Sequence, residues 1–309
     1  MKNGRNRNWT KIIKLGGRIM SKSKIQEIVE KQIIAKLEEG VCPWVKGWAD
    51  GGMPRNITTD REYNGINRLF TMMQGFGSPY WMSYKQAKEL GGNVIKGEKG
   101  VKIVYARTFE KEDKDTGEKK TFPVFRYSVI FNLEQCEEVK IPKKIQIKID
   151  YGKENKEKQT EINYSILTDF IEREKTLSFK KGKPSYAPKK DVIRMPDMES
   201  FFSSEEYVGI LAHECIHSTG HWMRLDRGFD KQGAYDMERD SYAKEELVAE
   251  IGSAFVCAML GVEKVLDNQV AYIASWKKKI KETAGIVVSS ASLAQRAVDY
   301  IIGETDVIS

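Results

Sequence analysis

The spacing of apolar and polar positions in the first half of the chain predicts a mixture of helices and strands. Between Ile25 and Leu37, apolar residues recur every three or four positions, which predicts one amphipathic helix that ends at Gly40. Residues 41–100 are rich in glycine, proline, asparagine and aromatic side chains, which indicates turns and short strands around a helix near residues 83–90. The segments VKIVYAR and TFPVFRYSVIFNLEQ then predict a hairpin whose strands are joined by the charged loop FEKEDKDTGEKK.

Helical periodicity dominates the second half of the chain. Helices are predicted in INYSILTDFIERE, EEYVGILAHECIHSTG, YAKEELVAEIGSAFVCAML, VAYIASWKKKIKE and SLAQRAVDYIIG. The segment SYAPKKDVIRMPDM instead indicates short strands interrupted by proline. We therefore expect an α+β protein with two domains: a small mixed α+β domain that binds nucleic acid, and a mainly helical domain with a small sheet.

Composition suggests where these domains begin and end. At 309 residues, the chain is long enough for two domains with separate cores. Residues 1–24 contain eight Lys/Arg and no acidic residue, without the apolar block of a secretory signal, so we expect a disordered basic leader, with Met20 as an alternative natural start. We expect the first domain at residues 25–143, a lysine-rich linker at residues 144–160 and the second domain at residues 161–309.

Charge and cysteine content narrow the class of protein further. No run of about 18 apolar residues occurs, so no membrane span is expected. The four cysteines form no CxxC pair, which is typical of a reduced, cytoplasmic protein. Residues 1–143 carry a net charge of +10, of which the leader supplies +8, and residues 144–309 carry −3. A polyanionic partner is therefore expected to meet the N-terminal half.

The stretch HECIH carries the clearest chemical signal. His213 and His217 are four residues apart, so on a helix they share one face and can bind one divalent ion, with Zn²⁺ expected and Mn²⁺ as the alternative. Glu214 lies next to them and is expected to act as general base on a water molecule that the ion makes acidic. This HExxH pattern predicts a metallopeptidase-like site.

A catalytic zinc site needs a third protein ligand, and the sequence offers several. His221 lies two residues closer than the third histidine of the HExxHxxGxxH pattern, which argues against it. On the next predicted helix, Glu246 and Glu250 are four apart and share a face. We expect Glu246 to be the ligand and Glu250 to orient a histidine, with Glu250 as the alternative ligand. Tyr235, Tyr242 and His221 are candidates for donating to a developing oxyanion.

Aromatic and basic residues alternate in the N-terminal half. Aromatic rings that stack on bases, beside cations that follow the phosphates, are typical of proteins that bind single-stranded DNA. The alternative is that most of these aromatic rings belong to the core. The expected DNA-binding residues are Trp44, Trp48, Arg55, Asn56, Tyr63, Asn67, Tyr80, Trp81, Lys85, Lys96 and Lys99.

Several longer motifs resemble a known family. PRN, YNGIN, SPYWMSYKQAKELGGNVIKGEKG and FNLEQ, in this order, resemble the N-terminal domain of ArdC-type antirestriction proteins. LAHECIHSTGHWMRLDR followed by YAKEELVAEIGSAF resembles their zincin-like metallopeptidase domain. The resemblance covers residues 25–305 and implies single-stranded DNA binding, a metallopeptidase fold, and protection of incoming mobile-element DNA from host restriction. It carries the HExxH roles to His213, Glu214 and His217, and that of the downstream acid to Glu246.

Two functions remain open at this level. In the first, a peptidase is tethered to DNA and acts on a protein substrate or a component of the restriction system. In the second, the protein shields single-stranded DNA, and the metal domain is structural or binds a partner. A primase accessory or nicking enzyme is disfavoured because the first domain lacks a constellation of acids for two metal ions.

Overall fold

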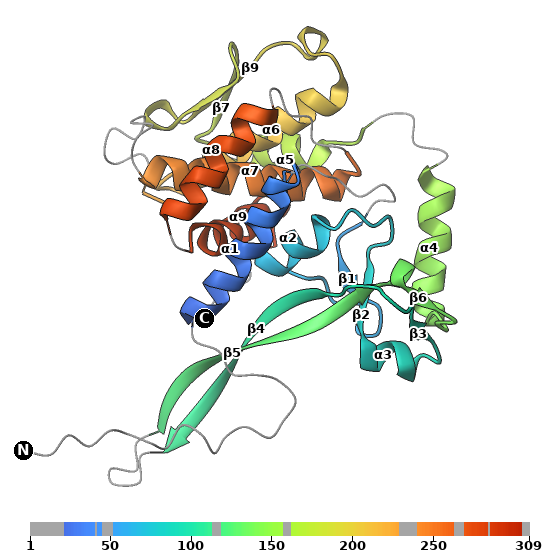
Figure 1. The fold of residues 1–309 in the computed structure, drawn as a ribbon. Helices are drawn as coiled ribbons and strands as arrows, with labels where there is room; N and C mark the ends of the chain where they lie inside the picture. The colour runs from blue at the N-terminus through green and yellow to red at the C-terminus, as the bar shows by residue number, and fades with distance from the viewer. Residues whose placement is uncertain are drawn as a thin grey trace, which may run out of the picture.

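The computed structural model has the expected two-domain α+β architecture (Figure 1). It describes residues 22–40, 42–44, 52–112, 119–156, 162–228, 240–262, 269–283 and 285–304. The helix predicted near the N-terminus is confirmed as α1 (Lys22–Glu38) and begins inside the predicted leader, whose residues 1–21 lie outside the described part. Among the described helices, none combines the length and the apolar character that a membrane span requires.

The first domain is built on a four-stranded sheet with the order β1-β2-β5-β4. Strand β2 pairs parallel to β1 and antiparallel to β5. A second, two-stranded sheet joins β3 and β6. The elements of this domain are β1 (Arg55–Asn56), α2 (Ile66–Met72), β2 (Tyr80–Ser83), α3 (Tyr84–Glu89), β3 (Asn93–Val94), β4 (Val101–Glu112), β5 (Lys119–Asn132) and β6 (Cys136–Glu137).

The predicted hairpin is confirmed as β4 and β5, but its strands are longer than expected. Their pairing continues from Val101↔Ile130 to Glu112↔Lys119, so residues placed in the charged loop extend both strands. Charged residues are compatible with this ribbon because it projects away from the body of the protein (Figure 1). Within the same domain, α3 begins where predicted, because Oγ of Ser83 accepts a hydrogen bond from the Gln86 backbone N–H and the Ser83 backbone N–H donates one to Oε1 of Gln86.

Most of the predicted linker forms helix α4 (Lys143–Lys156), which packs on the first domain. Ile145 is buried in a small core with Tyr80 and Met82. Lys144 and Lys148 on the same helix form ion pairs with Asp60. Ile145 and Ile149 are four residues apart and give the helix an apolar face, although lysines dominate the composition of this segment.

The second domain places helices around a three-stranded sheet with the order β7-β9-β8. Strand β9 pairs parallel to β7 and antiparallel to β8, and α6 packs on β8 and β9. Helix α7 packs against both α6 and α9, which also contact each other. The elements are α5 (Ser165–Arg173), β7 (Ser178–Lys181), β8 (Ser185–Ala187), β9 (Val192–Met195), α6 (Ser204–Thr219), α7 (Asp240–Leu260), α8 (Gln269–Glu282) and α9 (Ile286–Ile302). The five helices were predicted, although α9 begins earlier than expected, and β8 and β9 lie in the segment where short strands were expected, whereas β7 was not predicted.

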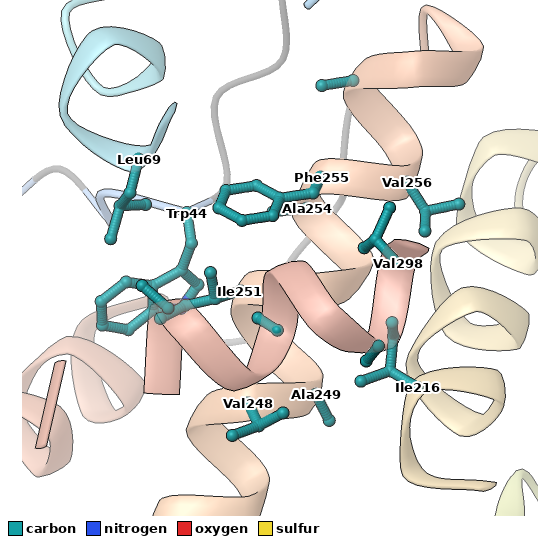
Figure 2. Packing of buried hydrophobic residues seen from close by; sticks show 14 of the residues in the cluster. Trp44, Leu69, Ile216, Val248, Ala249, Ile251, Ala254, Phe255, Val256 and Val298 are labelled. Atoms are coloured by element: carbon teal, nitrogen blue, oxygen red, sulfur yellow. The ribbon is translucent and has the colours of Figure 1, made fainter. Parts of the chain in front are cut away.

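One hydrophobic core runs through both domains. Helix α1 packs on α8 and α9 of the second domain (Figure 1), and the ring of Trp44 meets the edge of Trp276 with centroids 5.9 Å apart. Leu69 of α2 lies next to Phe255 of α7 (Figure 2), and the Arg68 guanidinium lies 5.3 Å from the centre of the Phe255 ring. Helix α1, the first described helix, therefore packs against the helices of the second domain.

Candidate functional site

Helix α6 holds the HExxH stretch in a fixed position. Ser203 caps its N-terminus by accepting a hydrogen bond from the Glu206 backbone at 3.2 Å. Along the helix, Leu211, Cys215 and Ile216 are buried in the main core. Because these side chains anchor the helix on the sheet and on α7, the histidines between them have little freedom to turn.

The structure brings His213, His217 and Glu246 together. Their potential ligand atoms all lie within 4.8 Å of one another, and no other such group of His, Cys, Asp and Glu occurs among the described residues. The two Nε2 atoms are 3.0 Å apart, and the oxygens of Glu246 lie 3.6 Å from Nε2 of His213 and 3.5 Å from Nε2 of His217.

These distances fit a tetrahedral ion. Bonds of about 2.0–2.1 Å at tetrahedral angles would place the donor atoms roughly 3.3–3.4 Å apart, close to the separations between the three side chains. The lone pairs of two imidazole nitrogens that face each other repel unless a proton or a cation lies between them. The donor set therefore suits one divalent ion.

Glu246 reaches this point because α7 approaches α6 closely. A Cβ atom at Gly252 would lie only 2.8 Å from Cδ1 of Ile216, so glycine is needed at this contact. Val248 and Ile251 are buried and fix the rotation of α7. The other predicted glutamate, Glu250, lies behind the first histidine, with Oε1 3.6 Å from Nδ1 of His213.

Electrostatics also link the side chains of this site. Burial alone raises the pKa of Glu246, but a hydrogen bond with His213 and the charges of His217 and His213 outweigh it and bring the pKa to about 2. Burial alone lowers the pKa of His217, but a hydrogen bond with Glu245 and the charges of Glu246, Glu245 and Glu214 raise it overall. Glu214 is itself buried, so its charge acts at short range on the neighbouring imidazole.

The remaining predicted residues of this site lie around it. His221 is buried outside the donor group, and its Nδ1 accepts a hydrogen bond from the Met223 backbone at 3.4 Å. Tyr242 forms a side-chain hydrogen bond with Glu246, next to the donor atoms. Tyr235 lies outside the described residues.

Two arginines and a glutamate near the site were not predicted. Arg224 donates to the Ser218 carbonyl at 2.7 Å and Arg227 donates to the Ile216 carbonyl at 2.7 Å, so both satisfy the last carbonyls of α6. Arg227 also binds Glu245, which contacts His217. The sequence signal was the presence of two arginines just after the helix, where basic residues are favoured.

The predicted stacking residues of the first domain are mostly part of the core. Trp44, Tyr80 and Trp81 are only 1%, 5% and 0% exposed, so the prediction that they stack on bases is wrong. The rings are buried because the sheet and the shared core close over them. Tyr63 is partly buried against the core, and Trp48 lies outside the described residues.

Polar residues predicted to contact DNA are also used inside the protein. The side-chain amides of Asn56 and Gln86 form two hydrogen bonds, both at 3.2 Å. Asn67 donates to the Val104 carbonyl at 2.6 Å and accepts from its N–H at 2.8 Å. Arg55 forms ion pairs with Asp60 and Glu62. The side chains of Asn56, Asn67 and Arg55 therefore have partners inside the protein, and their contact with DNA stays a prediction.

The predicted lysines are exposed, and one exposed aromatic residue lies among them. Lys85, Lys96 and Lys99 all face solvent. Tyr84, at the start of α3, is 54% exposed, and Nζ of Lys88 lies 5.9 Å from the centre of its ring. An exposed ring beside lysines is the arrangement that base stacking requires.

Comparison with protein families gives two matches. Residues 23–165 match the N-terminal domain of the anti-restriction factor ArdC, and residues 167–293 match a zincin-like metallopeptidase. Helix α4 falls within the first match.

Two crystal structures of an antirestriction protein have a similar fold. The metal-free crystal structure of ArdC from the R388 plasmid is similar with a TM-score of 0.71 and 33% sequence identity, covering 91% of this chain and 97% of that chain. Its Mn(II)-bound crystal structure gives a TM-score of 0.69 and 31% identity, covering 92% and 99%.

Curated relatives include longer proteins. A DNA primase TraC of Escherichia coli is 33% identical over 302 residues, which are 91% of this chain, and the chain spans only 20% of the primase. The uncharacterized protein y4eC of Sinorhizobium fredii (strain NBRC 101917 / NGR234) is 27% identical, covering 90% of this chain and 91% of that protein. With both domains present in the same order over nearly the whole R388 protein, this chain belongs to the ArdC family of antirestriction proteins.

Proposed function

We propose that this antirestriction protein is a metal-dependent peptide hydrolase that also binds single-stranded DNA and protects incoming mobile-element DNA from host restriction. The observation that carries the proposal is the convergence of donor atoms from His213, His217 and Glu246, with Glu214 on the same helix. Two histidines and one glutamate, with a position left for water, are the ligand set of several zinc peptidases.

Different side chains have different roles in the proposed hydrolysis. A divalent ion bound by His213, His217 and Glu246 would supply Lewis acidity, polarising a carbonyl and making a water molecule acidic. Glu214 is the general base: its carboxylate takes a proton from the attacking water and delivers it to the nitrogen of the leaving amine. Tyr242 and His221 are the described candidates for donating to the oxyanion.

Zinc is our first choice of ion, and manganese is the alternative. The donor chemistry, two imidazoles and a carboxylate, suits Zn²⁺ at tetrahedral distances. The similar R388 protein has a Mn(II)-bound structure, which supports a site that also accepts Mn²⁺. Elemental analysis of the purified chain and of a His213→Ala variant would distinguish the two ions and test whether this site holds them.

The second candidate function is shielding of single-stranded DNA without proteolysis. The exposed Tyr84, with Lys85 and Lys88 on the same helix, supports it because a base can reach the exposed part of the ring and the cations can approach phosphates. The similarity to a part of DNA primase TraC also supports a DNA-related role. In this case the metal domain would be structural or would bind a partner.

The expected setting is the cytoplasm. Cys42, Cys136, Cys215 and Cys257 are free thiols, which a reducing compartment maintains. There the chain would meet single-stranded DNA entering the cell, together with a protein substrate or a component of the restriction system.

A Glu214→Gln variant separates the two functions. The amide keeps nearly the same size but cannot accept the proton, so we expect metal and DNA binding to be retained and peptide cleavage to be lost. The variant would be compared with the wild type for cleavage of casein and for plasmid entry into a restricting host. Full protection of the plasmid by the variant would contradict proteolysis as the basis of antirestriction and would favour shielding.

A further inference from the structure

A row of three buried side chains connects one predicted metal ligand to the end of α6. Nδ1 of His217 lies 3.2 Å from Oε1 of Glu245, on the opposite side of the ring from the donor atom Nε2. Arg227 donates to both oxygens of the Glu245 carboxylate, at 2.8 and 2.7 Å. The side chains of Arg227 and Glu245 are only 4% and 6% exposed, so water has little access to either charge.

This contact selects one tautomer of His217. An ionised carboxylate can only accept hydrogen bonds, so Nδ1 carries the proton and donates it to Glu245. Nε2 then keeps its lone pair directed at His213 and Glu246, which is the state that a metal ligand requires. The negative charge behind the ring also makes Nε2 a stronger donor.

Arg227 holds this carboxylate in place and ionised. Its guanidinium reaches both oxygens of Glu245 in a fork, a geometry that lysine cannot reproduce. The same guanidinium donates to the Ile216 carbonyl and to Oγ1 of Thr219, both at 2.7 Å. Arg227 therefore fixes Glu245 of α7 relative to the last turn of α6, which carries His217.

The Nδ1 atom of the other histidine ligand, His213, has a weaker contact. Nδ1 of His213 lies 3.6 Å from Glu250, beyond the range of a good hydrogen bond. His217 is thus the ligand whose direction and tautomer are set by a buried ion pair. The proximity of Glu245 and Glu246 in the chain lets α7 contact both sides of the same imidazole.

We infer that Glu245 and Arg227 are positioning residues that hold His217 in its Nδ1–H tautomer and thereby increase the metal affinity of the site. This inference rests on the proposed metal site and adds two residues that do not contact the ion. Loss of such partners typically weakens metal binding by about 10–100-fold.

The test uses the full chain and two readouts. Competition with a chelator would give the affinity for Zn²⁺ and for Co²⁺, and the ¹⁵N signals of the His217 ring would give its tautomer after the metal is removed. Glu245→Ala is expected to bind Zn²⁺ about 10–100-fold more weakly and to show an Nε2–H population. Glu245→Gln keeps an acceptor for Nδ1–H, so the tautomer should persist while the affinity falls several-fold. Arg227→Met should weaken binding in the same direction.

Matched outcomes distinguish this inference from the proposed function. If the wild type binds neither Zn²⁺ nor Mn²⁺, the proposed metal site is wrong. If the wild type binds and Glu245→Ala retains both the affinity and the Nδ1–H signal, the positioning role is wrong. Should the alanine variant fail to fold, unchanged affinity in both Glu245→Gln and Arg227→Met would overturn it. Glu250→Gln, which alters the partner of His213, should leave the His217 signals in place.

Discussion

The close contact between α6 and α7 allows one perturbation to be worked out in detail. Gly252 lies on α7 opposite Ile216 of α6, and a Cβ atom at position 252 would lie 2.8, 2.9 and 3.0 Å from three carbons of the isoleucine side chain. Ile216 is fully buried and cannot move away freely. A Gly252→Ala substitution would therefore separate the two helices that carry His217 and Glu246.

Two opposing effects determine its magnitude. Overpacking a core typically costs about 1–3 kcal/mol, whereas replacing glycine by alanine within a helix contributes about 1 kcal/mol. We expect Gly252→Ala to lower the free energy of unfolding by about 0–2 kcal/mol and to weaken metal binding, because the donor atoms separate. In an Ile216→Ala background the contact is absent, and the same substitution should stabilise the protein by about 1 kcal/mol.

The resulting double-mutant cycle gives a coupling of about 1–3 kcal/mol between positions 216 and 252. Urea unfolding of the wild type, Gly252→Ala, Ile216→Ala and the double variant would measure it, with Zn²⁺ affinity determined on the same four proteins. Ile216→Ala alone serves as the control for loss of core volume. A Gly252→Ala effect of the same sign and size in both backgrounds would refute the idea that helix separation controls the site.

Three further substitutions test other parts of the structure. Tyr84→Ala should weaken binding of a single-stranded oligonucleotide by about 1–3 kcal/mol in a fluorescence anisotropy titration, whereas Tyr84→Phe should not, because it keeps the ring. Burial raises the pKa of Asp60, but its lysine and arginine partners outweigh this effect and lower the pKa from 3.8 to about 2. The contribution of Asp60 to stability is therefore full above about pH 4 and is lost as the pH falls through about 2. Asp60→Asn should remove this part of the pH dependence of the free energy of unfolding, measured by denaturant unfolding at several acidic pH values. Arg224→Ala leaves the Asp191 carboxylate without its main charge partner and should lower the free energy of unfolding by about 3–5 kcal/mol in urea.

The helices of the second domain could be predicted well because their signals are local, whereas α2 lies in a segment where turns and short strands were expected. The buried positions of α6, such as Leu211 and Ile216, recur at helical spacing, and the two histidines share a face for the same reason. Glu246 could be singled out because it lies on a second helix with buried neighbours. Helix α4 was not predicted because charged residues obscured its apolar spacing, although Ile145 and Ile149, four apart, mark the face that packs on the small core.

Long-range contacts explain what the sequence could not supply. Exposure of an aromatic ring depends on which elements pack over it, so the sequence could not show whether the predicted Trp81 or Tyr84, three residues later, reaches the surface. The tertiary fold buries the first and exposes the second. Likewise, the ion pair between Arg227 and Glu245 joins the segment after α6 to helix α7, and no local sequence pattern encodes how these two segments pack together.

The shared core limits how the two proposed activities can be separated. Helix α7 carries Glu246 near one end and Phe255 near the other. Phe255 lies next to Leu69 of the first domain (Figure 2), and the Arg68 guanidinium lies over its ring. Helix α1 covers α8 and α9, so removal of the N-terminal half would expose the apolar surface around Trp276. A truncated chain that lost activity would therefore reveal a disrupted core rather than a role for DNA. Point substitutions such as Glu214→Gln leave this core intact, and they can assign the biological effect to one half of the molecule.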